Sequence, residues 1–120
     1  MWTYSQSTGE LKHDGISIGF GYAGKGAGKN NPEMQHVRHV GPLCRGFYTM
    51  EEPYNSTLRG PMCIPLRPDP ENEMFGRSAF LVHGDSIKKP GTASEGCMIQ
   101  ARKIRQMLVA SPDKRLEVTL

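Results

Sequence analysis

The chain has 120 residues, of which 37% are hydrophobic and 22% are charged, so it can bury a core and is too apolar to be disordered. Its 15 basic and 12 acidic residues give a net charge of +3. No basic run alternates with aromatic residues, which argues against a nucleic-acid-binding protein. With 14 glycines and 9 prolines, the composition predicts one loop-rich globular domain over residues 1–120.

No stretch approaches the roughly 18 apolar residues that a membrane span needs. Residues 1–7 lack the basic start and apolar centre of a secretory signal peptide. Three cysteines allow at most one disulfide. We therefore expect a product made in the cytoplasm with reduced thiols, and no membrane span.

The first 20 residues indicate short strands joined by tight turns. A turn is expected at residues 7–9, and His-Asp-Gly at residues 13–15 is a strong hairpin signal. Apolar residues alternate over residues 16–20, the pattern of a half-buried strand.

A glycine-rich segment follows, and residues 19–25 formally match parts of two nucleotide-binding patterns. Both fail on context. Gly26 stands where a P-loop needs Ser or Thr to hold magnesium. The residues after Lys25 cannot propagate the helix that a dinucleotide fingerprint requires. A surface loop bordering a cleft is the preferred interpretation.

The middle of the chain predicts further short strands. We expect them around residues 37–40 and at residues 47–50. Residues 61–66 form another candidate, predicted at an edge because its prolines cannot donate hydrogen bonds to a sheet. Residues 69–76 are polar and typical of turns.

The last 40 residues hold the best central strand and the one expected helix. Residues 79–83 are a compact apolar run that predicts a central strand. Residues 101–110 have apolar positions at helical spacing, and the helix should end before Pro112. Alternation over residues 116–120 predicts a terminal strand. The whole pattern favours a mainly β sandwich or barrel of short strands with one helix near the C-terminus.

Two other sets of side chains have alternative explanations. His36 and His39 are spaced as zinc ligands could be, with His83 and Cys97 to complete a site, but the expected third ligand and glutamate base are not placed as in zinc motifs. We prefer surface histidines and expect no metal. Cys44 and Cys63 lie among apolar residues, where buried, inert thiols are expected. The sequence leaves open whether those two pair.

His83 and Cys97 are the strongest candidates for chemistry. His83 ends the apolar run at residues 79–83, and Cys97 follows Gly96 after a gap of 14 positions. A thiol becomes nucleophilic when its pKa falls below about 8.5 or a base removes its proton, and an imidazole can do both. Backbone N–H groups of Gly96 and Cys97 could form an oxyanion hole, and Asp85 or Ser86 could orient the imidazole.

These residues resemble a known group. His-Gly-Asp-Ser at residues 83–86, followed by Ser-Glu-Gly-Cys at residues 94–97, looks like the signature of YkuD-type L,D-transpeptidases. The opening residues 2–9, the loop at residues 21–32 and the segment at residues 76–80 resemble the L,D-transpeptidase-like effectors of type VI secretion, the Tlde family. The resemblance covers nearly the whole chain.

The resemblance implies a YkuD-like fold and an enzyme that needs no cofactor and acts on peptidoglycan stem peptides. Cys97 would attack the bond between diaminopimelate and D-alanine, with His83 as the base. Hydrolysis would give L,D-carboxypeptidase activity on tetrapeptide stems, and a free D-amino acid would give exchange. The resemblance also implies delivery by a secretion apparatus, action as an antibacterial toxin in the periplasm of a target bacterium, and a cognate immunity protein.

The expected site residues follow from this assignment. The candidate catalytic residues are Cys97, His83, Ser94, Gly96 and Asp85, and the candidate substrate-binding residues are Arg102, Gly84 and Ser86. Two departures stand out. Ordinary YkuD enzymes carry histidine where Glu95 stands, and Arg or Asn soon after the cysteine. Arg102 is the expected replacement for binding the substrate carboxylate. A non-catalytic module on the same scaffold, binding cell-wall peptide or a secretion component, is the alternative.

Overall fold

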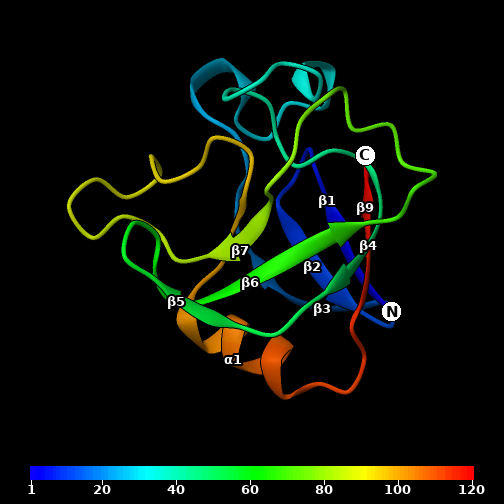
Figure 1. The fold of residues 1–120 in the computed structure, drawn as a ribbon, viewed down its shortest axis with the longest axis vertical. Coiled ribbons are helices and arrows are strands. Elements are labelled where there is room, and N and C mark those ends of the chain that lie inside the picture. Colours follow the sequence, from blue (N-terminus) through cyan, green and yellow to red (C-terminus); the bar gives the residue numbers. More distant parts are fainter.

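The computed structural model describes residues 1–120 and is mainly β, with one α-helix near the C-terminus, as the sequence predicts (Figure 1). The strands are β1 (Trp2–Ser5), β2 (Glu10–His13), β3 (Ile16–Phe20), β4 (Gly46–Met50), β5 (Tyr54–Ser56), β6 (Gly60–Pro68), β7 (Leu81–His83), β8 (Met98–Ile99) and β9 (Arg115–Thr119). The helix is α1 (Arg102–Ala110), and two short 3-10 turns are η1 (Gly26–Gly28) and η2 (Pro32–Met34). No helix has the length and apolar character that crossing a bilayer would require.

The strands follow the order β3-β2-β1-β9-β4-β6-β7-β8, and β5 pairs with β6. Two neighbouring pairs in this order, β1 with β9 and β7 with β8, are parallel. An antiparallel bridge between Tyr22 and Ile99 joins the segment after β3 to β8. This bridge brings the chain just after β3 beside β8, so the sheet curves toward closure while β3 itself stays an edge strand.

Local sequence explains several elements. Asp14 and Gly15 have φ values of 49° and 84°, so they form the tight turn predicted between β2 and β3. The predicted strands at residues 47–50 and 116–120 are present as β4 and β9, and the predicted helix is present as α1. Lys114 donates to the carbonyls of Leu108 and Val109 at 3.0 and 2.9 Å, which satisfies the last turn of α1.

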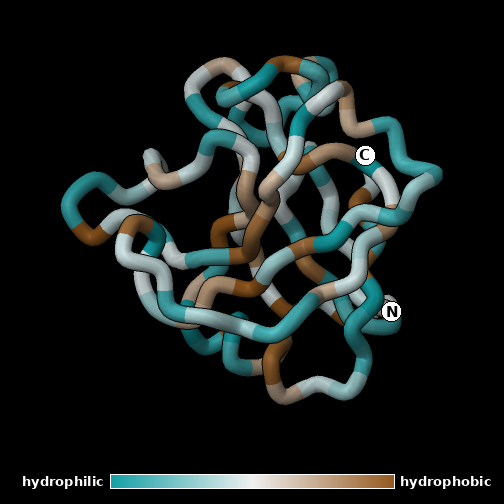
Figure 2. Tube along the Cα trace, in the orientation of Figure 1, coloured by the Kyte–Doolittle hydropathy of each residue, from teal (hydrophilic) through white to brown (hydrophobic).

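The core is one cluster of 16 buried residues drawn from strands along the whole chain. In Figure 2 the strands through the middle carry most of the brown, hydrophobic segments, and the outer loops are mostly teal. Val82 and Met98 belong to this core and are 0% and 1% exposed. One face of β7 and β8 therefore packs against the core, and the side chains on the other face do not belong to this cluster.

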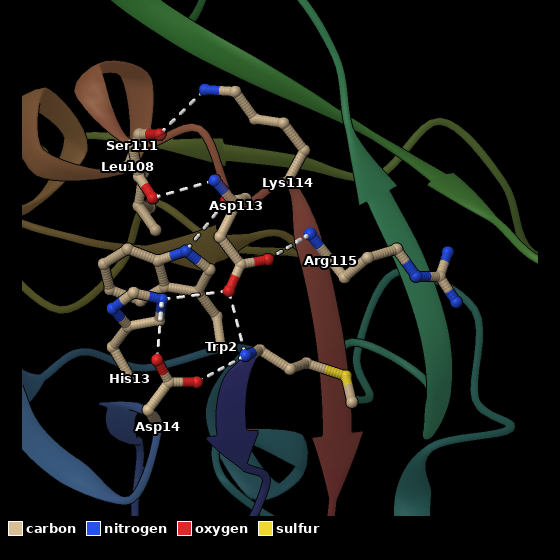
Figure 3. A network of polar contacts seen from close by, with 9 residues as sticks. Trp2, His13, Asp14, Leu108, Ser111, Asp113, Lys114 and Arg115 are labelled. Carbon is tan, nitrogen blue, oxygen red and sulfur yellow. Dashed lines mark hydrogen bonds and ion pairs between the residues drawn. The ribbon is translucent and has the colours of Figure 1, made fainter.

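A polar network beside the core fixes the start of β1 (Figure 3). The Trp2 ring stacks on His13 with 4.0 Å between the ring centroids, and its Nε1 donates to the Asp113 carbonyl at 3.0 Å. His13 Nε2 lies 2.9 Å from Asp113 Oδ2. The Met1 ammonium group lies between the carboxylates of Asp14 and Asp113, at 2.6 and 2.9 Å. These contacts link β1, β2 and the segment before β9.

Three sequence-based expectations were wrong. Ile16 and Phe20 of β3 are 69% and 66% exposed, because β3 lies at the edge of the strand order, where little covers either face. Residues 35–41 form turns in place of a strand. β6 is an internal strand although it contains prolines: it pairs with β5, β4 and β7 over different stretches, and Pro65 still accepts a hydrogen bond from Glu51 N–H.

Candidate active site

The two principal candidates lie on β7 and directly before β8, which are adjacent strands. Their parallel register pairs Val82 with Met98 and His83 with Ile99. Successive side chains in a strand point to opposite faces, so His83 faces away from the side on which Val82 joins the core. Cys97 directly precedes β8, and its Sγ lies against the Leu81 N–H of β7. Cys97 lies two positions before Ile99, the residue that pairs with His83. No hydrogen bond joins the two side chains.

The hydrogen bonding of His83 fixes its tautomer. Nδ1 lies 2.9 Å from the Gly84 carbonyl oxygen. A carbonyl oxygen only accepts, so Nδ1 carries the proton and Nε2 carries a free lone pair. Nε2 is buried and has no hydrogen-bond partner. Burial lowers the pKa of His83, although the bond to Gly84 acts in the opposite direction. The side chain is therefore a neutral base at neutral pH.

Cys97 lies just before β8 and is partly exposed, whereas Cys44 and Cys63 are buried, and all three thiols are free. Its Sγ accepts a hydrogen bond from the Leu81 backbone N–H at 3.3 Å. Burial raises the pKa of Cys97, and the Leu81 N–H lowers it in part. The resting site therefore contains a thiol and a neutral imidazole. A thiol in this state reacts once a base takes its proton.

The loop before Cys97 is held by the hydroxyl of Ser94. Ser94 is 1% exposed. Its Oγ donates to the Cys97 carbonyl at 2.7 Å and accepts from the N–H groups of Gly24 and Gly96 at 2.8 and 3.0 Å. All three hydrogen-bonding positions of the hydroxyl are filled. Ser94 therefore positions the loop that carries the nucleophile.

Gly96 is required by both conformation and space. Its φ is +144°, and a Cβ there would lie 2.5 Å from Arg77 Nη2 and 2.7 Å from Phe80 Cε1. The predicted sharp turn before the nucleophile is present. The expectation that its N–H helps form an oxyanion hole was wrong, because that N–H donates to Ser94. The Cys97 N–H makes no hydrogen bond and stays available.

A pocket of about 350 Å³ opens beside His83. It is lined by three segments far apart in the sequence: the glycine-rich loop, the turn between β5 and β6, and the loop between β7 and β8. In Figure 1 the turn between β5 and β6, in green, and the loop between β7 and β8, in yellow, lie on the same side of the molecule. Its lining includes Gly84, Ser86 and Lys25, so the glycine-rich loop does border a cleft, as its composition predicts.

Asp85 lines the same pocket but does not orient the imidazole, contrary to expectation. Its carboxylate accepts from the Tyr22 hydroxyl at 2.6 Å and from the N–H groups of Ser86 and Gly91. Burial raises the pKa of Asp85, but these donors outweigh it and the net direction is downward. Burial and the bond to Asp85 together raise the pKa of Tyr22 to about 12. The carboxylate thus folds the loop after β7, and the Gly84 carbonyl orients His83.

The arginine in the pocket differs from the one expected. Arg102 is exposed at the first residue of α1 and does not line the pocket. Arg59 does line it, and donates to the Ala93 carbonyl at 3.5 Å. The sequence offered no signal for Arg59, because a hairpin turn 24 residues before His83 brings it there.

A second pocket of about 310 Å³ lies on the other side of Glu95, whose side chain lines both. His39 in this second pocket pairs with Glu95 at 3.1 Å. His36 lies edge-on to Phe75. Both histidines are exposed, as predicted. The potential metal ligands whose atoms lie close together are those of His13, Asp14 and Asp113, a group that includes neither His36 nor His39.

Comparison with known proteins supplies one match. A family model described as the Tlde1 domain matches residues 19–118, which include β7, β8 and the loop between them. A search of curated proteins found no match.

Proposed function

This chain belongs to the Tlde1 domain family of type VI secretion effectors, and on that premise we propose that it is a cysteine L,D-carboxypeptidase acting on the tetrapeptide stems of peptidoglycan. One observation carries the proposal above the others. The unprotonated Nε2 of His83 is buried without a partner, and the Cys97 thiol lies at the Leu81 N–H, two residues before His83 on the same strand. An unpartnered buried nitrogen is costly for stability, and a proton from Cys97 would give it the missing bond.

The reaction begins with transfer of the thiol proton. Nε2 of His83 accepts the proton from Cys97 Sγ, and the Gly84 carbonyl stabilises the imidazolium through Nδ1–H. Sγ forms a bond to the carbonyl carbon between diaminopimelate and D-alanine, and the carbonyl oxygen becomes an oxyanion. The free Cys97 N–H is the available backbone donor for that oxyanion.

Collapse of the tetrahedral intermediate breaks the C–N bond and leaves a thioester. The imidazolium gives its proton to the departing amine, so D-alanine leaves as a neutral amine. Water then attacks the thioester while His83 accepts its proton, and the tripeptide acid departs as the thiol is restored. When the amine of a free D-amino acid attacks in place of water, the same steps give exchange.

Either outcome removes the tetrapeptide donors that cross-linking uses. This activity would place the protein in the periplasm of a target bacterium, with a cognate immunity protein in the producer and the secretion apparatus as a delivery partner. Four residues support the reaction without reacting: Ser94 and Gly96 shape the nucleophile loop, and Gly84 and Asp85 shape the loop after His83.

The test is to digest purified tetrapeptide muropeptides, with and without an added D-amino acid, and to resolve the products by chromatography and mass spectrometry. Wild-type protein should release tripeptide, and Cys97→Ala and His83→Ala should release none. Cys44→Ser and His36→Ala are matched controls, because Cys44 is a buried free thiol and His36 is an exposed histidine that packs against Phe75. Full product yield from Cys97→Ala would overturn the mechanism. Peptide binding without any product from wild type would favour a binding module.

A further inference from the structure

The charged side chains that line the pocket beside His83 differ in whether they have partners. Two carboxylates and two cationic side chains line it, apart from His83 itself. Asp85 is held by three donors, and Glu95 pairs with His39. Neither Lys25 nor Arg59 has a carboxylate within ion-pair distance. The carboxylates and cations are equal in number, but both cations lack an ion-pair partner, so either is free to bind an anionic ligand.

Of the two cations, Arg59 is the better placed to bind one. Its backbone N–H donates to Ser56 Oγ at 3.0 Å, which fixes the turn, and its Nη1 contacts the Ala93 carbonyl. The other guanidinium donors are free. A guanidinium presents paired N–H groups that match a carboxylate, and Lys25 offers no such fork.

Arg59 acts electrostatically on both reacting side chains. Its charge lowers the pKa of both His83 and Cys97, so it lies within electrostatic reach of each. In a peptide that loses its last residue, the terminal carboxylate is separated from the attacked carbonyl carbon by only one residue, about 3.8 Å of chain. A cation that lines the pocket beside His83 can therefore meet that carboxylate.

We propose that Arg59 binds the C-terminal carboxylate of the stem peptide, on the residue that the reaction releases. This inference rests on the proposed function and adds a cause for its selectivity. An enzyme that requires a terminal carboxylate next to the scissile bond removes single C-terminal residues. It does not cut within a longer stem, because an internal residue has no such group.

A binding measurement tests the proposal without catalysis. Titration calorimetry on the Cys97→Ala protein should show that a tetrapeptide stem with a free C-terminal carboxylate binds roughly tenfold or more tightly than the same peptide as its C-terminal amide. Adding Arg59→Gln should abolish this preference and leave amide binding unchanged. Arg59→Lys should keep part of it, because the charge remains and the fork is lost.

Matched variants identify the cation. Arg59 is exposed on a turn, so Arg59→Gln should fold normally, and circular dichroism checks this. Arg45→Gln is the neutral control, since Arg45 is exposed and outside this pocket. Loss of the preference in Lys25→Gln or Arg102→Gln, with Arg59→Gln unaffected, would overturn the assignment. So would equal binding of acid and amide to the Cys97→Ala protein.

Cleavage measurements separate this inference from the proposed function. With active protein, Arg59→Gln should lower kcat/KM for the acid peptide to the value for the amide. If wild type cleaves neither peptide but the calorimetric preference follows Arg59, the proposed function fails and the carboxylate site stands. If wild type cleaves the acid and amide peptides equally well, the proposed function survives in part and the role of Arg59 is refuted.

Discussion

The imidazole of His83 donates its Nδ1 proton to the carbonyl oxygen of Gly84, the next residue in the chain, at 2.9 Å. Many cysteine and serine enzymes orient their histidine with a side-chain carboxylate or amide. Here the orienting group is part of the backbone. Burial lowers the pKa of His83, and the hydrogen bond to this carbonyl offsets only part of that effect. The site therefore starts from a neutral pair.

The neutral pair predicts a distinctive pH dependence. Because burial lowers the pKa of His83, its base form persists to a pH below the ordinary value of about 6.5, and kcat/KM should fall only below that point. Because burial raises the pKa of Cys97, alkylation by iodoacetamide should be slow at pH 7 and rise about tenfold per pH unit into the alkaline range. Mass spectrometry of the peptide containing Cys97 measures the rate. Fast, pH-independent alkylation between pH 5 and 8 would instead indicate a thiolate–imidazolium pair.

Gly84 should not tolerate a side chain. A Cβ at this position would lie 2.7 Å from Nη2 of Arg105, whose guanidinium is fixed on the carbonyls of Gln100, Pro61 and Met62. Gly84→Ala should therefore shift the carbonyl that orients His83 and lower kcat by roughly 100-fold. The shorter side chain in Gly84→Ala/Arg105→Gln should recover part of the rate. An unchanged kcat in Gly84→Ala, measured on tetrapeptide stems, would show that the carbonyl position is not critical.

Ser94→Ala should weaken both the fold and the site. The substitution removes one donor and one acceptor that serve Cys97, Gly24 and Gly96, and leaves buried backbone groups unpaired. We expect the free energy of unfolding to fall by about 1–3 kcal/mol in urea titrations. Ser17→Ala on the exposed edge strand is the matched control and should change it by less than about 0.5 kcal/mol. Equal stabilities of the two variants would contradict the positioning role of Ser94.

Trp2→Phe should destabilise the centre of the sheet. Trp2 is 2% exposed, stacks on His13 and donates to the Asp113 carbonyl, and phenylalanine keeps neither the volume nor the donor. We expect a loss of about 2 kcal/mol or more. Trp2 is the sole tryptophan, so unfolding is followed by circular dichroism. Phe20→Leu, at a residue that is 66% exposed, should have little effect, and a comparable loss there would undermine the argument.

The parts of the fold that the sequence predicts are those decided by near neighbours. Asp14 and Gly15 specify their turn whatever surrounds them, and α1 follows from its own apolar spacing and from Pro112. The exposure of β3 depends on which strands pair beside it. The internal place of β6 depends on three partners that change along its length. Such long-range strand pairings cannot be predicted from the residue pattern in a short window of sequence.

The same division holds for the site. His83 and Cys97 could be selected from residue type and spacing, because their side chains carry the chemistry. The Gly84 carbonyl could not, since every residue has one and only the folded geometry selects it. Ser94 was expected to be catalytic, but its hydroxyl is fully engaged by the backbone around it. The hairpin that pairs β5 with β6 brings Arg59 to the pocket, whereas Arg102 lies exposed on α1.

The parallel pairing of β1 with β9 has a consequence for biosynthesis. Residues 2–5 pair on that side only with residues 116–119, so the seam between them cannot close until residues 116–119 have left the ribosome. Contacts this distant in sequence slow folding and delay cooperative assembly. This seam should therefore be among the last parts of the domain to form during folding.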